Sequence, residues 1–172
     1  MQLYKKFWNE TFTKDDVLKD FSLVYPDNYN FGYDVVDKMA ELAPNDRAVV
    51  WCDADGNEKT FTFADIKDLS NRAANVFLAH GIKKGDKVLV ILKRNYEYWY
   101  VAPALHKIGA VLIPATHMLT AEDIVYRVEA AHITAAVCTP QSDAADKVMK
   151  ASKLNPLLKT VFVTHGAYEG AV

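Results

Sequence analysis

The sequence has few cysteines, and they are not arranged as a disulfide framework or a metal site. Cys52 and Cys138 are far apart along the chain, and neither lies in a CxxC pair or beside a group of histidines. Structural zinc sites and disulfide-rich domains require such clusters. The pattern therefore argues against a disulfide, a metal site or a cysteine nucleophile. Each cysteine ends a short apolar run, so we predict that both are small residues of the core.

Phosphate-binding and hydrolytic motifs are also missing. The chain contains no GxGxxG after a strand, no GxxxxGK[ST] loop, and none of the HExxH, DxDxDG or GxSxG patterns. These motifs supply close backbone amides, metal ligands or a nucleophile at fixed spacing. The sequence by itself therefore assigns no catalytic residue.

No strong charge and no long apolar run is present. The formal net charge is −2 and the basic residues are interspersed with acids, so nucleic acid is not predicted as a partner. The N-terminus has no apolar signal region, and no uninterrupted apolar run is long enough to cross a bilayer. We predict a cytoplasmic protein with no transmembrane segment. The hydrophobic share of 51% is that of a folded domain with a core.

The chain does contain a regular alternation of strand-like and helix-like segments. The helical segments cover 33–42, 62–81, 95–109, 120–131 and 142–152, and the strands cover 48–52, 59–62, 88–92, 110–113, 135–138 and 160–163. The first two strands, with turn residues between them, predict a hairpin. The later alternation predicts an α/β fold, a doubly wound and mostly parallel sheet with helices on both faces.

Several helix boundaries carry recognisable signals. Thr62–Asp65 resembles a capping box, Thr120 opens another helix, and Asn95 is predicted to cap a third. Gly81 and Gly109 suit the left-handed position that ends a helix. Before the first helix, residues 1–31 form an aromatic-rich arm that we predict to be irregular after a short helix. Such an arm needs a surface to lie against.

Two loops follow predicted strands and hold side chains that could contact a ligand. They are Lys93–Asn95 and the loop that contains His117. Ligands of doubly wound sheets gather at the carboxyl ends of the strands. A loop hydrogen bond or a surface ion pair is the stronger reading for Arg94 and His117. His106 and His132 are predicted at the surface, and His165 in a frayed tail.

The region from about Phe31 to Val137 resembles a known family. The segments that carry the resemblance are, in order, 31–37 (FGYDVVD), 59–66 (KTFTFADI), 69–75 (LSNRAAN), 81–88 (GIKKGDKV), 92–99 (LKRNYEYW), 106–111 (HKIGAV), Pro114 and 124–127 (IVYR). Their joint order and spacing are similar to the N-terminal domain of AMP-forming acyl-CoA synthetases of the medium-chain type. The resemblance implies that residues 32–172 are the first part of a large N-terminal domain, and that residues 1–31 are an arm.

The resemblance also implies a two-step ligase that uses ATP, Mg²⁺ and CoA. A carboxylic acid, by resemblance a fatty acid, is activated as acyl-AMP and transferred to CoA. The family's phosphate loop, ribose-binding Asp and mobile catalytic Lys occur further along such chains, and none is found here. The remainder of its own chain is therefore the expected partner. We expect residues 1–172 alone to be inactive, with no tightly bound cofactor.

One site residue can be carried over by resemblance. In related enzymes the loop corresponding to Thr116–Thr120 approaches CoA through small glycines, whereas this chain has His117 and Met118. A bulky side chain cannot copy a close backbone approach. His117 is the candidate CoA-binding residue.

Two other functions stay open at this stage. The chain could be a free-standing, non-catalytic module that binds a partner through an exposed apolar surface. It could also belong to an enzyme that adenylates an acid without using CoA. Acyl-chain length and oligomeric state are not encoded in these residues.

Overall fold

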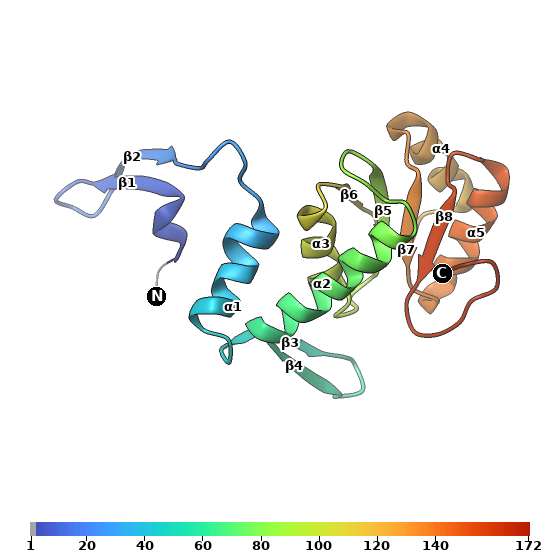
Figure 1. Ribbon diagram of the computed structural model, residues 1–172, viewed down its shortest axis with the longest axis horizontal. Coiled ribbons are helices and arrows are strands. Elements are labelled where there is room, and N and C mark those ends of the chain that lie inside the picture. The colour runs from blue at the N-terminus through green and yellow to red at the C-terminus, as the bar shows by residue number, and fades with distance from the viewer. Residues whose placement is uncertain (1–2) are drawn as a thin grey trace.

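The computed structural model describes residues 3–172 and begins with an N-terminal hairpin (Figure 1). A short 3-10 helix, η1 (Leu3–Lys6), precedes β1 (Trp8–Phe12) and β2 (Leu18–Leu23), which pair antiparallel. The prediction of a short helix is confirmed, but the prediction of an otherwise irregular arm is wrong. Trp8 and Phe12 lie on one face of β1, but Glu10 lies between them on that face, so the strand does not show a simple alternation of apolar and polar residues.

The middle of the chain forms a helical segment and a second hairpin. η2 (Gly32–Asp37) has π-helical geometry and continues into α1 (Lys38–Leu42), so the helix predicted over 33–42 is confirmed. The predicted hairpin is confirmed as β3 (Arg47–Cys52) and β4 (Glu58–Thr62). These two strands make a sheet of their own and do not extend the parallel sheet.

The rest of the chain is the predicted doubly wound sheet. Its four parallel strands lie in the order β6 (Val111–Pro114), β5 (Lys87–Ile91), β7 (Ala135–Cys138) and β8 (Thr160–Val163). One face packs against α2 (Phe63–Ala79) and α3 (Tyr98–Lys107). The other face packs against α4 (Ala121–Ala131) and α5 (Ala144–Leu154), which follows the short η3 (Gln141–Asp143).

Burial of β5 on both faces explains its continuous apolar sequence. Val88 and Val90 pack with α2 and α3, whereas Leu89 and Ile91 pack with α4 and α5. All four side chains are at most 2% exposed. A central parallel strand covered by helices on both sides needs apolar residues at every position, not at alternate ones.

The helix boundaries agree with most of the predicted caps. Thr62 and Asp65 form a reciprocal capping box at α2, and Thr120 and Asp123 form another at α4. Gly81 and Gly109 have the positive φ expected of helix-ending glycines. The cap predicted at Asn95 is wrong, because α3 begins later and the Asn95 side chain donates to the Thr139 hydroxyl at 2.9 Å.

A buried lysine ties the middle of the chain to the helices of the sheet. The Lys107 ammonium, 1% exposed, lies 2.7 Å from the Asp37 carboxylate on η2. It also donates to the Ser70 hydroxyl at 2.8 Å and to the Asn71 amide oxygen at 2.7 Å. Gly32 permits this approach, since a Cβ there would meet Lys107 Cγ at 2.6 Å and the Pro103 carbonyl oxygen at 2.9 Å.

The two cysteines lie in different environments. Cys138 is in the core, as predicted, and burial raises the pKa of its thiol to about 12. The same prediction for Cys52 is wrong, because the end of β3 lies on a two-stranded sheet and leaves that thiol exposed. Among residues 3–172, no helix combines the length and apolar character that crossing a membrane requires.

Candidate functional site

The carboxyl edge of the parallel sheet brings four loops together. These loops follow β5, β6, β7 and β8, and the register pairs Ile91 with Cys138 and Cys138 with Val163 at this edge. The connection from β5 leads to α3 on one face, whereas the connection from β7 leads to α5 on the other. The gap between β5 and β7 is therefore the topological switch point, where open α/β sheets place their ligands.

Side chains from the loops after β5 and β7 contact each other across this switch point. The Lys93 ammonium donates to the Ser142 hydroxyl at 3.0 Å. Behind it, the buried Asn95 amide donates to the Thr139 hydroxyl, and the Thr139 backbone amide donates to the Ile91 carbonyl oxygen. These contacts fix both loops, and they leave the Arg94 side chain exposed at the edge.

A carboxylate–imidazole pair joins the loop after β8 to the start of α3. The Glu97 side chain is 4% exposed, and its Oε1 lies 3.1 Å from Nε2 of His165. Its second oxygen, Oε2, is buried without a hydrogen-bond partner. His165 is thus held by Glu97, and the prediction that it lies in a frayed tail is wrong. The Glu97 charge also adds to burial in raising the pKa of Tyr100.

Unusual backbone conformations gather at the same edge. Lys93, Ser142, Asp143 and His165 all have φ between 54° and 66°, in the left-handed region that non-glycine residues rarely adopt. Such residues persist only where the surroundings hold them, and they are common near functional sites. The loops at the carboxyl edge are thus held in defined backbone conformations.

His117 lies in the loop after β6, at this edge, as the sequence predicts. Its backbone carbonyl oxygen accepts a hydrogen bond from the Lys147 ammonium at 3.3 Å, and its side chain is half-buried. The neighbouring Met118 is 77% exposed. Lys93 and Arg94 are cations at the same edge, whereas the Lys147 ammonium is also paired with the Asp143 carboxylate at 2.9 Å.

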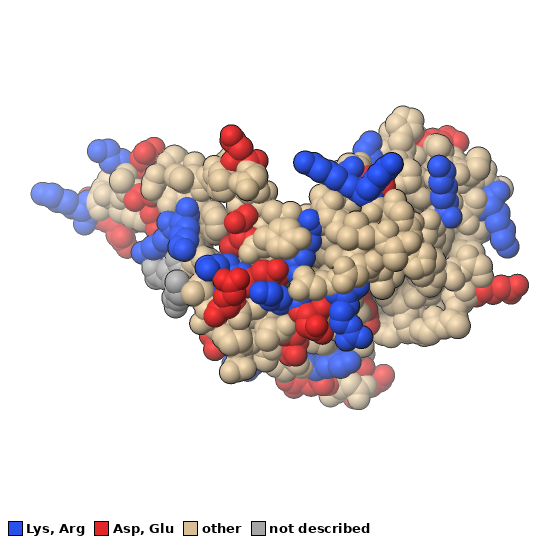
Figure 2. Space-filling view, in the orientation of Figure 1, with Lys and Arg blue, Asp and Glu red and all other residues tan. Residues whose placement is uncertain are grey.

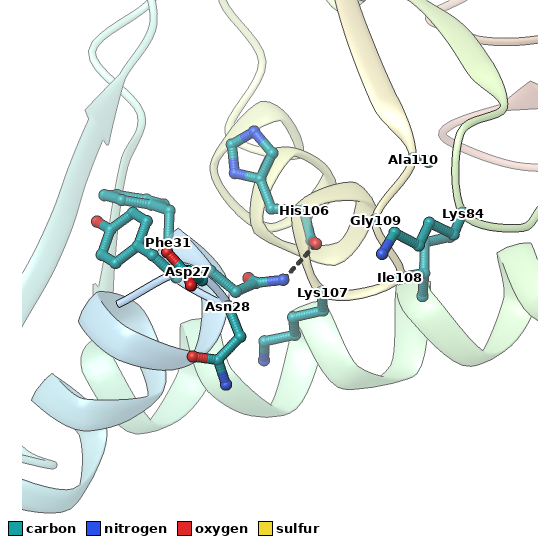
Figure 3. Close-up of a pocket in the computed structure, with 11 residues that line it drawn as sticks. Asp27, Asn28, Phe31, Lys84, His106, Lys107, Ile108, Gly109 and Ala110 are labelled. Carbon is teal, nitrogen blue, oxygen red and sulfur yellow. Dashed lines mark hydrogen bonds between the residues drawn. The ribbon is translucent and has the colours of Figure 1, made fainter. Parts of the chain in front are cut away.

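The pocket shown in Figure 3 lies elsewhere, at the amino edge of the sheet. It has a volume of about 500 Å³ and lies between the arm residues Asp27–Phe31 and the end of α3. The Asn30 side chain donates to the His106 carbonyl oxygen at 2.7 Å, which fixes the arm there. Because strands begin at this edge, the pocket is not the site that the fold predicts.

His106 is less exposed than the sequence indicates. Its ring packs edge-on against Phe31 at 5.9 Å, and Nδ1 is buried without a partner. Burial lowers the pKa of its imidazole. The predicted surface position holds only in part, because the aromatic arm covers one side of the ring.

The residues of this chain do not fit the whole cofactor set that the resemblance implies. Residues 3–172 contain no group of three or more His, Cys, Asp or Glu side chains placed to hold a metal ion. The chain also lacks a glycine-rich phosphate loop. No residue is therefore assigned to Mg²⁺ or to the ATP phosphates. The exposed Lys93 and Arg94 side chains at the carboxyl edge have the charge that the phosphates of CoA would require.

Sequence reasoning missed Lys107 and the Glu97–His165 pair. Both connect residues that are far apart in the sequence, and lysine and glutamate are ordinarily read as surface residues. A weak signal exists for Lys107, since it follows the buried residues Pro103 and Ala104 at helical spacing. No comparable signal marks His165.

Comparison with known sequences finds one matching family model and a set of similar curated proteins. Residues 36–170 match the model of the family described as "AMP-binding enzyme". The human acyl-coenzyme A synthetase ACSM3, mitochondrial, is 32% identical over 91% of this chain and 28% of its own length. The mouse ACSM3 is 31% identical over 98% of this chain and 30% of its own length. The chain thus spans less than a third of these relatives.

Solved structures show the same fold. An acyl-CoA synthetase from Brucella canis superimposes with a TM-score of 0.75, covering 87% of this chain and 27% of that chain, at 21% identity. A structure described as a putative long-chain-fatty-acid CoA ligase from Rhodopseudomonas palustris gives a TM-score of 0.71, at 23% identity, with 85% and 35% covered. At such identities the match establishes the fold alone.

Proposed function

The chain belongs to the family of AMP-binding enzymes, and from this premise we propose that it is the N-terminal part of an ATP-dependent acid–thiol ligase. The match over residues 36–170 carries the proposal, and the mammalian acyl-CoA synthetases that match most of the chain support it. The reaction activates a carboxylic acid, which we take to be a fatty acid, and transfers its acyl group to CoA.

The proposed chemistry has two steps. A carboxylate oxygen attacks the α-phosphorus of ATP, pyrophosphate leaves, and an acyl-adenylate forms. The CoA thiolate then attacks the acyl carbon, and AMP leaves. Mg²⁺ would supply charge neutralisation on the polyphosphate in the first step. This chain carries no motif for that step, so the residues that perform it belong to the remainder of the protein.

This chain would contribute one side of the reaction site, namely the carboxyl edge of the parallel sheet. The carboxyl edge presents Lys93, Arg94 and Lys147 beside the loop of His117. We propose that this edge faces the reaction site and that His117 contacts CoA. Use of CoA, instead of another acceptor, rests on the acyl-CoA synthetase relatives and on the segments around Arg94 and Tyr126–Arg127. A cytoplasmic location stays a prediction, and the mammalian relatives are named as mitochondrial.

The test is product analysis on the protein encoded by the complete reading frame that contains this sequence. With ATP, Mg²⁺, CoA and fatty acids of increasing length, the expected products are an acyl-CoA, AMP and pyrophosphate. Acyl-adenylate that accumulates without thioester would point to a different acceptor. If no acid yields either product, the ligase proposal fails and the non-catalytic, partner-binding module becomes the better account.

A variant of the same protein tests the role of His117. Replacing His117 by Ala should raise the KM for CoA and leave the KM for ATP unchanged. His132→Asn is the matched control, because His132 is an exposed histidine at the opposite edge of the sheet and Asn tolerates its left-handed backbone. If His117→Ala and the unmodified enzyme have the same KM for CoA, His117 does not contact CoA and is a structural residue of its loop.

A further inference from the structure

The chain that leaves β8 is anchored on both faces of the parallel sheet. We define the post-β8 loop as residues 164–170. On the face covered by α2 and α3, His165 of this loop contacts Glu97 at the start of α3. On the face covered by α4 and α5, the Tyr168 hydroxyl donates to the Asp146 carboxylate of α5. The post-β8 loop therefore crosses the carboxyl edge from one face to the other.

The contact between His165 and Glu97 joins loops from two strands that are not neighbours. Glu97 follows β5 and His165 follows β8, and β7 lies between these strands in the sheet. Nε2 of His165 lies 3.1 Å from Oε1 of Glu97, so the contact joins the two loops that flank the carboxyl end of β7. Because the topological switch point lies between β5 and β7, this contact borders the place where the fold binds ligands.

The contact requires an arrangement that costs free energy. The Glu97 side chain is 4% exposed, and its second oxygen is buried without a hydrogen-bond partner. Most buried polar atoms have a partner, and an unpaired one destabilises the folded state. His165 has a φ of 66°, and the next residue, Gly166, has a φ of 111°. An apolar residue at position 97 and a relaxed turn would avoid both costs, and such costs persist mainly where the geometry is itself required.

An aromatic cluster fixes the other side of His165. The Tyr96 ring meets the His165 ring edge-on, with the ring centroids 6.2 Å apart. Tyr96 packs in turn against Trp51 and Phe61 of the β3–β4 hairpin, with centroids at 5.3 and 5.2 Å. The Lys59 ammonium donates to the Tyr96 hydroxyl at 3.1 Å. His165 thus lies between a fixed ring and a buried carboxylate, and its position does not depend on the loop alone.

We propose that Glu97 is a positioning residue, which acts through His165 to fix the post-β8 loop beside the reaction site. This inference rests on the proposed function, because it takes the carboxyl edge to face that site. Glu97 does not touch the substrate, since its carboxylate is buried. It acts on the geometry of the loop, and a small displacement of a positioned group slows the reaction of the bound complex more than it weakens binding.

Single substitutions separate the contact from its surroundings. Glu97→Leu removes the acceptor with little change in volume, whereas Glu97→Gln keeps an oxygen that can accept from Nε2 of His165. His165→Asn removes the imidazole and keeps a residue that tolerates a left-handed backbone. Because His165 is 36% exposed, this variant keeps the test open if Glu97→Leu does not fold. His132→Asn is the matched control, since His132 is also left-handed, with a φ of 53°, and lies exposed at the opposite edge.

Hydrogen exchange of the backbone amides in residues 164–170 tests the contact without any substrate. It should be measured by mass spectrometry on the protein that the complete reading frame encodes. Glu97→Leu and His165→Asn should each speed exchange in the post-β8 loop by about tenfold, as loss of a hydrogen bond to a charged group would. Glu97→Gln and His132→Asn should exchange as the unmodified protein does. Unchanged exchange in both Glu97→Leu and His165→Asn would overturn the proposal.

Steady-state kinetics of acyl-CoA formation by the same protein test the positioning role. Glu97→Leu and His165→Asn should each lower kcat about tenfold with little change in the KM values, and Glu97→Gln should keep most of the kcat. Because both residues act through one contact, the double variant Glu97→Leu/His165→Asn should be no slower than the slower single variant. Multiplied losses in the double variant, or an equal loss in His132→Asn, would contradict a shared role.

The two measurements separate this inference from the function on which it rests. If the unmodified protein forms no acyl-CoA from any acid, the proposed function fails and the positioning role fails with it, even where exchange shows that Glu97 holds the loop. If the unmodified protein is active, and Glu97→Leu loosens the loop without lowering kcat, the proposed function stands and only the positioning role is overturned.

Discussion

Lys107 shows how far a single side chain can depart from its ordinary behaviour. Lysine is among the residues least often buried, yet this ammonium is 1% exposed and is surrounded by Asp37, Ser70 and Asn71. Three partners at 2.7 to 2.8 Å replace the hydration that burial removes. The pair joins η2 to α2 and α3, so it fixes the middle of the chain on the sheet.

Replacing Lys107 by Met should destabilise the protein by about 3–5 kcal/mol, since the Asp37 carboxylate would stay buried without its cation. Urea unfolding measures this change. Lys150→Met is the matched control, because the Lys150–Glu122 pair at 3.0 Å is more than 60% exposed and its loss should leave the free energy of unfolding almost unchanged. A similar decrease in the free energy of unfolding in both variants would contradict the conclusion that burial makes the Lys107–Asp37 pair important for stability.

The two thiols should differ in reactivity toward a thiol reagent at neutral pH. Cys52 is exposed, whereas Cys138 is buried with its pKa raised to about 12. A thiolate is the reactive form, so the native protein should titrate one thiol rapidly and the unfolded protein two. Cys52→Ser should abolish the fast reaction. Two fast thiols in the native protein would contradict the buried position of Cys138.

At the scale of single residues, the sequence predicted what depends on neighbours along the chain. The helix-ending glycines Gly81 and Gly109 and the capping threonines were found because their signals are local. Asn95 was assigned a local cap, but a distant hydroxyl, that of Thr139, holds its amide. Partnerships across 40 or more residues leave no such signal in a single sequence.

At the scale of elements, the helices of the sheet begin where their side chains satisfy the free amides. In both α2 and α4, the capping threonine accepts from the third helical amide, and the aspartate at that position accepts from the threonine amide. Thr120→Ala should therefore cost about 1 kcal/mol of stability at neutral pH, as measured by thermal or urea unfolding.

The same capping box predicts a pH dependence. The hydrogen bonds from Thr120 lower the pKa of the Asp123 carboxyl below its ordinary value of 3.8. A lowered folded-state pKa stabilises above the ordinary pKa, and that contribution is lost as the pH falls through the lowered value. Asp123→Ala should therefore be less stable than the unmodified protein at neutral pH, and the gap should close in acid. A gap that stays constant with pH would contradict this assignment.

Periodicity predicted the strands of the sheet better than it predicted the arm. The apolar run in β5 and the alternation of strands and helices pointed directly to a covered parallel sheet. In the N-terminal hairpin, Glu10 interrupts the apolar face and the register shifts between Thr11 and Phe12. These two irregularities hid a strand pattern that pairing makes plain.

At the scale of the whole molecule, charge and apolar surface are distributed differently. Figure 2 shows acidic and basic side chains intermixed over the central part of the molecule, with no large area of one sign in this view. Exposed large apolar side chains occur on the β1–β2 hairpin, for example Phe12 and Phe21, and also on the helices and loops of the sheet, for example Met118 and Tyr126. Contacts with other polypeptide surfaces, more than general charge attraction, are therefore expected to define how this chain assembles.

The fold class and the family were accessible from sequence, whereas the complete active site was not. The order of segments from Phe31 to Val137 carries the family, and the match over residues 36–170 confirms it. The chain spans about 28% of the human relative, and no phosphate loop or metal cluster lies within its described residues. The ligase reaction is thus a proposal for the protein as a whole and not for residues 1–172 alone.

Carboxylate-dependent exchange of pyrophosphate into ATP tests this account most directly. It should be measured in parallel on residues 1–172 and on the product of the complete reading frame, with a range of fatty acids. We predict no exchange above background for residues 1–172 and clear, acid-dependent exchange for the complete product. Exchange by residues 1–172 alone, or its absence from the complete product with every acid, would contradict the account.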